Sequence, residues 1–273
     1  MTINCKGKLI DFSSPKVMGV LNITPDSFYD GGYYSNEKEI LHQTEKMLTE
    51  GATFIDVGAY SSKPGAIHIS EQEELKRIIP AIKAILREFP KTLISVDTFR
   101  SSIAKETVAI GASLINDISG GTFDEKMFET IAKLNIPYIL MHIKGTPQNM
   151  QKNPTYENIT TELISFFANQ IFKLHQLQLK DVIIDVGFGF GKTIEHNYQL
   201  LKDLSLFKNL DVPILVGVSR KSMLYKPLNI SAKEALNATT SAHTIALLNG
   251  ANILRVHDVK EAVQAINIVN LVN

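Results

Sequence analysis

Polar side chains able to bind or transform a ligand recur along this chain, each directly after a short apolar run. They are Asn22, Asp56, Asp97, Asn116 with Asp117, His142, Asp185, Ser219 with Lys221, and Arg255 with His257. Taking a carboxylate out of water costs free energy unless a partner or a ligand satisfies it. One such residue could simply cap a following helix, but the whole series favours a shared binding site.

Residues 185–192 read DVGFGFGK and form the most conspicuous local motif. Glycines at 187, 189 and 191 would let the backbone approach a flat or anionic ligand closely, because they carry no Cβ. A dinucleotide-binding fingerprint would read G-x-G-x-x-G, so the spacing G-x-G-x-G argues against that ligand class. A tight turn from strand to helix, without any ligand, is the alternative interpretation of the motif alone.

Two further segments offer cations or hydrogen-bond donors to an anion. Residues 217–221 read GVSRK and lack the second glycine of the G-x-S-x-G nucleophile elbow, which argues against a serine hydrolase. We interpret them as a basic cluster in which Ser219 can meet an anion, and Arg220 can be a solvated surface charge. Arg255 and His257 stand two apart on one predicted strand, so their side chains face the same way and together suit an anion.

Oxygen ligands for a metal ion gather in the loop after the first apolar run. Asn22, Asp26 and Asp30 offer hard oxygens of the kind that Mg²⁺ prefers, although an ordinary loop is the alternative. The histidines include no H-E-x-x-H pair or other zinc spacing. We therefore expect His142 to be a hydrogen-bonded structural residue.

Eight short apolar runs predict the buried parallel strands that position these residues. The runs are Val17–Leu21, Thr53–Val57, Leu93–Val96, Ser113–Ile115, Pro137–Met141, Val182–Ile184, Ile214–Val218 and Ile253–Val256. Between them, helices are predicted over Glu71–Glu88, with Ser70 as N-cap, and over Asn158–Leu179 and Thr239–Asn249. Eight strands alternating with helices predict an α/β fold, a (β/α)8 TIM barrel, whose carboxyl-terminal mouth carries the chemistry.

Composition supports one such domain over residues 1–273, because barrels of this kind have about 250 residues. Lys and Arg number 28, as do Asp and Glu, so the balanced charge argues against nucleic-acid binding. A single cysteine excludes an intrachain disulfide. Residues 1–14 lack the apolar region of a signal peptide, and no apolar run is long enough to span a bilayer. We therefore expect a cytoplasmic location and no membrane contact.

Taken in order, the motifs resemble the dihydropteroate synthase family from about Val17 to Val269. The matching stretches are MGVLNITPDSF (18–28), DVGAYSSKPGA (56–66), SVDT (95–98), INDISGG (115–121), LMH (140–142), DVGFGFGK (185–192), VGVSRKSM (216–223) and RVHDVKE (255–261). The resemblance implies a barrel transferase of folate biosynthesis that uses Mg²⁺, joins a pterin pyrophosphate to p-aminobenzoate and is the target of sulfonamides. It also implies a homodimer, for which the small and apolar residues of 231–249 and 258–269 suit a self-complementary patch.

The resemblance assigns a role to most of the polar residues and requires no covalent enzyme nucleophile. It implies that Asp185 binds the pterin and that Asp97, Asn116 and Lys221 contact other atoms of the pterin ring. Met141 and Gly217 are implied as further substrate contacts. The resemblance also implies that Asn22 binds the departing pyrophosphate through Mg²⁺, together with Arg255, His257, Asp30 and Lys63. The p-aminobenzoate site implied by the resemblance consists of Phe28, Ser62, Pro64, Phe190 and Ser219.

The second loop departs from the family pattern. Family members commonly read S-T-R-P-G where residues 61–65 read SSKPG, so Lys63 keeps the charge but loses the two-pronged geometry of arginine. Tyr60 stands where a glutamate is often found. Two alternatives follow: a pterin-binding methyltransferase, which would need no pyrophosphate site, and a non-catalytic pterin-binding paralogue, which only Lys63 and Tyr60 favour.

Overall fold

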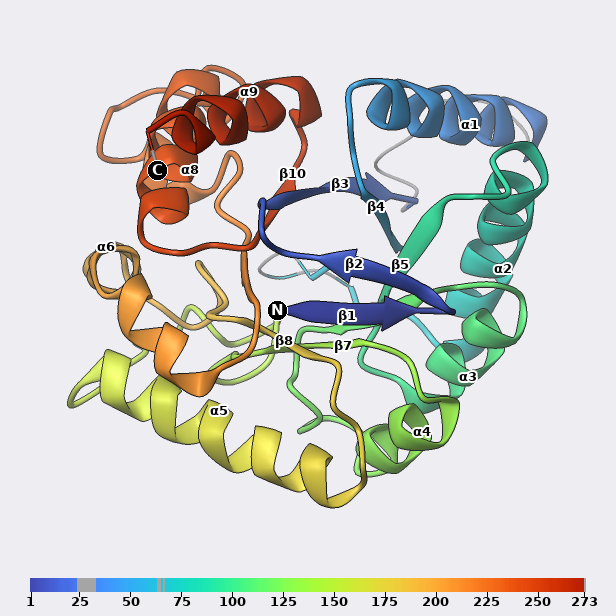
Figure 1. Ribbon diagram of the computed structural model, residues 1–273, viewed down its shortest axis with the longest axis horizontal. Coiled ribbons are helices and arrows are strands. Elements are labelled where there is room, and N and C mark those ends of the chain that lie inside the picture. The colour runs from blue at the N-terminus through green and yellow to red at the C-terminus, as the bar shows by residue number, and fades with distance from the viewer. Residues whose placement is uncertain (24–32, 63–64, 66, 273) are drawn as a thin grey trace.

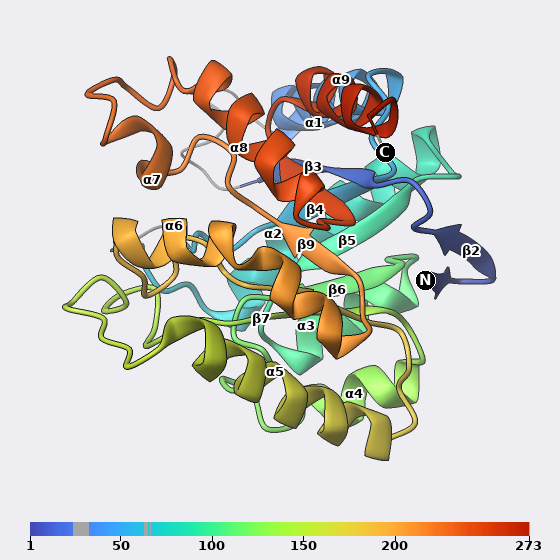
Figure 2. The same ribbon diagram turned by 60° about the vertical axis from the view of Figure 1, so that its left-hand side comes forward.

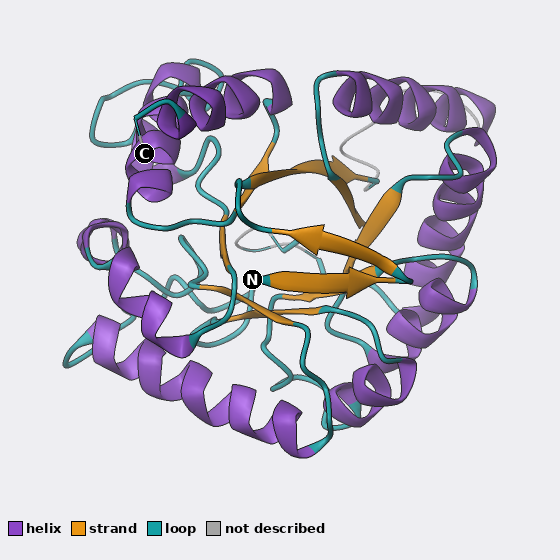
Figure 3. Ribbon diagram, in the orientation of Figure 1, coloured by secondary structure: helices purple, strands orange, loops and turns teal. Residues whose placement is uncertain are grey.

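The computed structural model describes residues 1–23, 33–62, 65 and 67–272 of the chain. Among them, eight parallel strands close into a barrel in the order β10-β3-β4-β5-β6-β7-β8-β9, and β1 and β2 form a separate two-stranded sheet. Figures 1 and 3 show the helices as an outer ring around the strands. The predicted (β/α)8 barrel is therefore confirmed.

The barrel strands are short and buried, as the apolar runs predicted. They are β3 (Lys16–Asn22), β4 (Phe54–Gly58), β5 (Leu93–Asp97), β6 (Leu114–Asp117), β7 (Tyr138–Met141), β8 (Val182–Asp185), β9 (Ile214–Val216) and β10 (Ile253–Val256). Only β9 is clearly shorter than predicted, because Gly217 and Val218 already belong to the loop that follows it. Burial on both faces explains why these strands are nearly continuous apolar sequences.

Amphipathic helices connect the strands. They are α1 (Tyr33–Thr49), α2 (Glu71–Glu88), α3 (Ser101–Ala109), α4 (Met127–Leu134), α5 (Ile159–Gln176), α6 (Ile194–Lys202), α7 (Ser222–Tyr225), α8 (Leu236–Leu248) and α9 (Val259–Asn270), with the 3₁₀ helix Leu204–Leu210. Helix α2 has the predicted bounds, and the Ser70 hydroxyl accepts a hydrogen bond from the Glu73 amide as its N-cap. No helix in the described ranges is long and apolar enough to cross a membrane.

A hairpin before the barrel was missed by the sequence analysis. Strands β1 (Thr2–Cys5) and β2 (Lys8–Asp11) pair in antiparallel fashion around a turn at Lys6 and Gly7, both with positive φ. The buried side chains of this hairpin region, Ile3, Cys5, Ile10 and Phe12, pack on the lowest layer of the barrel interior. Figure 2 places the hairpin at the end of the barrel away from α7. The hairpin therefore covers the amino-terminal end of the barrel with apolar surface.

The inward-facing side chains of the strands form two layers of the barrel interior, an apolar layer and a polar layer nearer the mouth. The apolar layer contains Met18, Phe54, Leu93, Leu114, Ile139, Ile183, Leu215 and Ile253. Because side chains two apart on a strand share a face, the next interior residues toward the mouth are polar on five strands. Those residues are Asp56, Ser95, Asn116, Asp185 and Arg255. The polar layer is therefore built by strands, at positions that the sheet fixes.

Candidate active site

Arg255 joins three strands at the centre of the polar layer. Its Nε donates to Oδ2 of Asp56 at 2.6 Å, and its Nη2 donates to Oδ2 of Asp97 at 2.9 Å. Asn116 completes the cluster, because its Nδ2 donates to the same Oδ2 of Asp56 at 3.0 Å. Attraction to the two carboxylates raises the pKa of the guanidinium further above its usual range. Arg255 therefore lies in the barrel as a charge already neutralised by carboxylates, which the sequence did not indicate.

Asp56 belongs to the predicted series of polar residues, but no role was predicted for it. It lies within β4 rather than at the strand end, and its side chain is fully buried. Its second oxygen, Oδ1, and the Oδ1 of Asn116 are both buried and accept no hydrogen bond from any residue that the structure describes. An acceptor left in this state costs about 1–3 kcal/mol. Buried acceptors without donors suit a ligand that carries N–H groups.

Asp97 and Asp185 are carboxylates whose pKa is raised by burial. For Asp97, burial raises the pKa to about 7; Arg255 opposes this effect, while Asp56 adds repulsion. Burial also raises the pKa of Asp185, and the nearby Lys221 acts in the opposite direction. Oδ1 of Asp185 accepts a hydrogen bond from the Gly187 amide at 2.8 Å. Both side chains are therefore buried carboxylates, shielded from water, that a ligand donor would stabilise.

Lys221 lies beside the glycine-rich loop. Its Nζ donates to the Phe188 carbonyl and lies 4.6 Å from the centre of the Phe190 ring. Burial lowers the pKa of Lys221 to about 8, although Asp185 favours the charged form. The structure thus brings Lys221, Phe190 and Asp185 together. A Cβ added to Gly217 would lie 3.9 Å from Oδ2 of Asp185 and 3.8 Å from Cβ of Arg255, so Gly217 is part of the same cluster.

The glycine-rich loop owes two of its three glycines to packing rather than to a ligand. A Cβ on Gly187 would lie 2.0 Å from the His142 carbonyl oxygen, and one on Gly191 would lie 2.4 Å from the Lys144 carbonyl oxygen. Both glycines also have positive φ, which side chains disfavour. The prediction that all three glycines serve ligand approach is therefore too broad. At Gly187 and Gly191, the alternative of a tight turn accounts for the residue.

Ser219 and His257 form a pair at the edge of the cluster. Ser219 Oγ lies 3.1 Å from Nδ1 of His257 and accepts from the His257 amide at 3.3 Å. The neighbouring Arg220 was interpreted as a possible solvated charge, and this is wrong. Its Nε and Nη2 donate to the two carboxylate oxygens of Asp258 at 2.8 and 2.9 Å, and Nη1 donates to the carbonyls of residues 232 and 233. Arg220 therefore fixes the loop that carries Ser219.

Two polar residues of the predicted series do not join the site. Asp117 faces away from the barrel interior, where it accepts hydrogen bonds from Ser119, from the Gly121 amide and from the Tyr138 hydroxyl. His142 contacts the buried Lys192 ammonium through Nδ1 at 3.1 Å, as expected for a structural residue. Burial lowers the pKa of His142, and Lys192 adds to the effect. The strand period explains both, since each follows an inward-facing residue by one position.

The remaining predicted residues lie around the mouth. Asn22 ends β3, and its Oδ1 would lie 3.5 Å from a Cβ added to Gly58 at the end of β4. Met141 is buried at the end of β7, and Ser62 is half-buried. Phe28, Asp30, Lys63 and Pro64, with Asp26, lie outside the described residues. Among the residues with described positions, no three His, Cys, Asp or Glu side chains gather as a metal site.

This geometry defines a barrel enzyme whose mouth offers buried carboxylate and amide oxygens to a polar, N–H-rich ligand. A profile described as "Pterin binding enzyme" matches residues 18–257. The dihydropteroate synthase of Escherichia coli (strain K12) is 41% identical over 271 residues, which cover 98% of this chain and 95% of that protein.

Solved structures of dihydropteroate synthases are also similar to this chain in fold and sequence. A Yersinia pestis dihydropteroate synthase in a sulfonamide drug complex has a TM-score of 0.93 and 42% identity, covering 100% of this chain and 99% of that one. A Xanthomonas albilineans dihydropteroate synthase with 4-aminobenzoic acid has a TM-score of 0.92 and 33% identity, covering 99% and 97%. The chain belongs to the pterin-binding enzymes and, within them, to the dihydropteroate synthase family.

Proposed function

We propose that this chain condenses 6-hydroxymethyl-7,8-dihydropterin pyrophosphate with p-aminobenzoate, giving 7,8-dihydropteroate and pyrophosphate. The observation that carries the proposal is the pair of buried acceptors without donors, Oδ1 of Asp56 and Oδ1 of Asn116, next to the buried carboxylates of Asp97 and Asp185. The 2-amino-4-oxo edge of a pterin presents neighbouring N–H donors. A ring of oxygens is the complement of that edge.

Each side chain of the cluster has a definite task in this proposal. Asp185 accepts the two adjacent donors of the pyrimidine edge, because a carboxylate offers two oxygens side by side. Asn116 donates an amide proton to Asp56, and its carbonyl oxygen, which has no donor among the described residues, is left to the pterin. Asp97 accepts from a further ring N–H, and Lys221 donates to the ring oxygen and a ring nitrogen.

The reaction takes place at the exocyclic methylene carbon. The carbon–oxygen bond to pyrophosphate breaks with its electron pair on the leaving oxygen, and the pterin ring delocalises the positive charge. The amine nitrogen of p-aminobenzoate then forms the new carbon–nitrogen bond and loses a proton. Positive charge near the leaving group lowers the barrier. Two carboxylates already balance the charge of Arg255, and burial lowers the pKa of His257 to about 4, so both residues serve in this proposal as hydrogen-bond partners of the leaving oxygens. Nη1 of Arg255 makes no hydrogen bond with a described residue.

Magnesium fits this site through one amide oxygen of the protein. Asn22 ends β3 at the mouth and offers a hard oxygen. When bound, Mg²⁺ would neutralise the pyrophosphate oxygens. Asp30 and Lys63 remain predicted partners of the pyrophosphate, and Phe28 and Pro64 predicted partners of p-aminobenzoate. Ser62, Ser219 and Phe190 complete the second-substrate site in this proposal.

A homodimer is the proposed assembly. Ile245 and Leu248 of α8 and Ile268 of α9 are 46%, 53% and 61% exposed, and α8 packs against α9. Apolar side chains on two adjacent helices suit a patch that a twofold axis places against itself. Sedimentation at micromolar concentration should give twice the chain mass, and Ile245→Glu should give the single chain. A wild-type monomer would contradict the assembly.

The activity is tested by incubating the purified chain with both substrates and Mg²⁺. The product should appear with one pyrophosphate per dihydropteroate, and omission of p-aminobenzoate should stop both. A pterin-binding methyltransferase would instead bind methyltetrahydrofolate and release no pyrophosphate. A non-catalytic paralogue would bind the pterin pyrophosphate without turnover. The similarity to proteins named dihydropteroate synthase favours the first outcome over both alternatives.

A further inference from the structure

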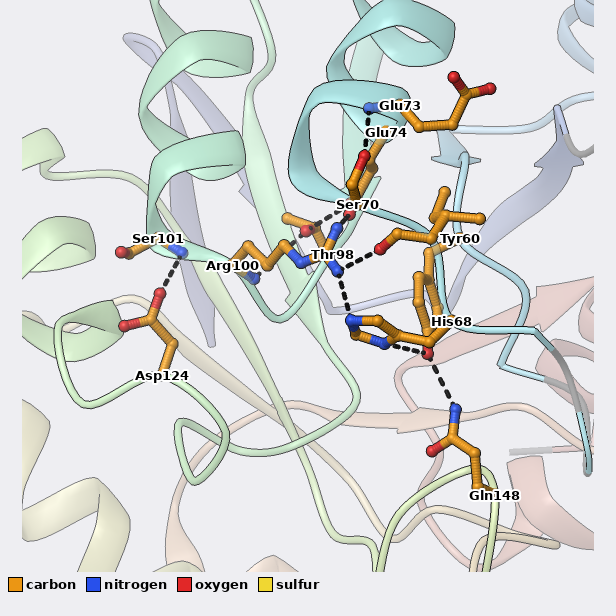
Figure 4. Close-up of polar contacts among 11 residues, drawn as sticks. Tyr60, His68, Ser70, Glu73, Glu74, Thr98, Arg100, Ser101, Asp124 and Gln148 are labelled. Atoms are coloured by element: carbon orange, nitrogen blue, oxygen red, sulfur yellow. Dashed lines mark hydrogen bonds and ion pairs between the residues drawn. The ribbon is translucent and has the colours of Figure 1, made fainter.

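A second polar network lies outside the pterin cluster, at the rim of the mouth (Figure 4). Its centre is Arg100, which directly precedes α3 and follows the end of β5. The guanidinium donates through Nη1 to Oε2 of Glu74 at 2.6 Å and through Nη2 to the Ile69 carbonyl at 2.6 Å. Nη2 also lies 3.2 Å from Nε2 of His68. Arg100 therefore ties helix α2 and the end of the second loop to strand β5.

The base of the network is a buried ion pair. The Glu74 side chain is fully buried and that of Arg100 is 12% exposed. Glu74 also accepts a hydrogen bond from the Thr98 hydroxyl at 2.8 Å. Burial raises the pKa of Glu74, while Thr98 and Arg100 lower it. Since a buried charge is strongly disfavoured without its partner, Arg100 is held in one place.

His68 bridges Arg100 to Tyr60. Nδ1 of His68 lies 3.2 Å from the Tyr60 hydroxyl, which also accepts a hydrogen bond from Nε2 of Gln148 at 3.1 Å. Arginine can only donate, so Nε2 of His68 must be the acceptor and Nδ1 must carry the proton that is donated to Tyr60. The Tyr60 ring also packs edge-on against Phe99, with centroids 5.1 Å apart. The bridge therefore requires neutral His68 in one tautomer.

These contacts hold both ends of the second loop. Tyr60 stands at its start and His68 and Ile69 at its end, with Ser62 between them. The middle of the loop is held as well, because the Gly65 amide donates to the Pro147 carbonyl at 3.4 Å. The contacts of Tyr60 and His68 stay outside the polar layer of the barrel, whereas Arg100 is linked to it through Glu74, whose charge raises the pKa of Asp97. Changes at Tyr60 or His68 can therefore act on the second loop without acting on the pterin cluster.

We propose that Tyr60, His68 and Arg100, here called the rim clamp, are positioning residues that set the second loop for p-aminobenzoate through Ser62. This inference rests on the proposed function, which places Ser62 in the second-substrate site. The rim clamp touches no reacting atom. Loss of the Tyr60–His68 bridge raises the ordering cost that p-aminobenzoate must overcome, so it weakens binding of that substrate and leaves pterin binding unchanged.

The test compares graded variants in steady-state kinetics with both substrates. His68→Ala should raise KM for p-aminobenzoate about tenfold, with kcat and KM for the pterin pyrophosphate within about twofold, because one or two hydrogen bonds are lost. His68→Gln should recover most of the loss, since an amide offers one acceptor to Arg100 and one donor to Tyr60. Tyr60→Phe keeps the ring and should lie between them. Arg77→Ala breaks an ion pair with Glu73 on the same helix and is the matched control.

A separate measurement keeps this inference distinct from the proposed function. Hydrogen exchange of amides 61–69 should be faster in His68→Ala than in wild type, with an unchanged unfolding midpoint. The rim clamp would be overturned if His68→Ala raised KM equally for both substrates. It would also be overturned if this variant changed neither KM nor the hydrogen exchange of amides 61–69. A wild-type chain that forms no dihydropteroate would overturn the proposed function instead. In that case, unchanged exchange in His68→Ala would still refute the clamp.

Discussion

Two regions of the mouth are built by different means. The floor residues, Asp56, Asp97, Asn116, Asp185 and Arg255, stand on strands, so sheet register sets their spacing: Asp97 pairs with Gly58 on one side and Asn116 on the other. The rim clamp stands on loops and depends on hydrogen bonds between side chains. A rigid, flat pterin suits the strand-borne floor, whereas the proposed second-substrate site draws on loop residues. The two regions should therefore respond differently to substitution.

The largest effect is expected at Asp56, because this floor residue serves two others. Asp56→Ala removes the acceptor of Arg255 and of Asn116 and leaves a buried charge with one partner fewer. We expect a loss of roughly 3 kcal/mol in the free energy of unfolding, since breaking a buried pair costs that much or more. Urea titration measures it. Asp11→Ala, at an exposed position of the hairpin, is the control. An equal loss of unfolding free energy there would contradict the claim that the buried contacts of Asp56 cause the effect.

The next effect separates binding from folding. Asp185→Asn keeps the shape of the side chain but sets an amide donor against a pterin donor, a mismatch worth roughly 1–3 kcal/mol. Pterin affinity measured by calorimetry should fall at least tenfold, and p-aminobenzoate binding should fall only as a consequence. Asp181→Asn, directly before the start of the strand that ends at Asp185, should keep the wild-type affinity. Wild-type pterin affinity in Asp185→Asn would remove this residue from the pocket.

Asp97 should give pterin binding at the floor a pH dependence. Burial raises its pKa to about 7, so below that pH the protonated group loses an acceptor and pterin affinity falls. Affinity should therefore rise as the pH rises through about 7 and then level off. The sign is opposite for folding: the unfolded carboxyl ionises near 3.8, so this group lowers the free energy of unfolding as the pH rises from there to about 7. Calorimetry between pH 5 and 9 measures the pterin affinity. In Asp97→Asn, the rise in affinity through about pH 7 should be absent.

The smallest effect is expected at Lys63, which lies outside the described residues. Lys63→Arg should keep or raise activity, because a guanidinium can donate two parallel hydrogen bonds to a phosphate. Lys63→Ala should lower kcat/KM by a few-fold. Steady-state rates at two salt concentrations test the charge, since screening weakens an exposed contact. An alanine variant with wild-type rates would leave the second loop without a charged role.

Much of the barrel could be predicted from local patterns. Apolar runs indicated all eight strands, and helical spacing after Ser70 indicated α2 with its observed bounds. Motif similarity also identified Asp97, Asn116, Asp185, Lys221 and Gly217, which the structure brings together. The predictions of strands and helices succeed because strand burial and helix capping depend on residues close in sequence. The β1–β2 hairpin escaped notice since its strands have four residues each, too few for alternation to stand out.

What the sequence determined by itself is the set of strands and the polar residues on them; their partners were decided by the tertiary structure. Arg255 reaches Asp56 only because β10 pairs with β3 and closes the barrel next to β4. The barrel likewise brings Asn116 of β6 to Asp56 of β4, 60 residues earlier in the chain. The same holds for Arg220 with Asp258 and for the rim clamp. Side-chain pairing over such separations depends on barrel closure and loop position, and no local periodicity contains that information.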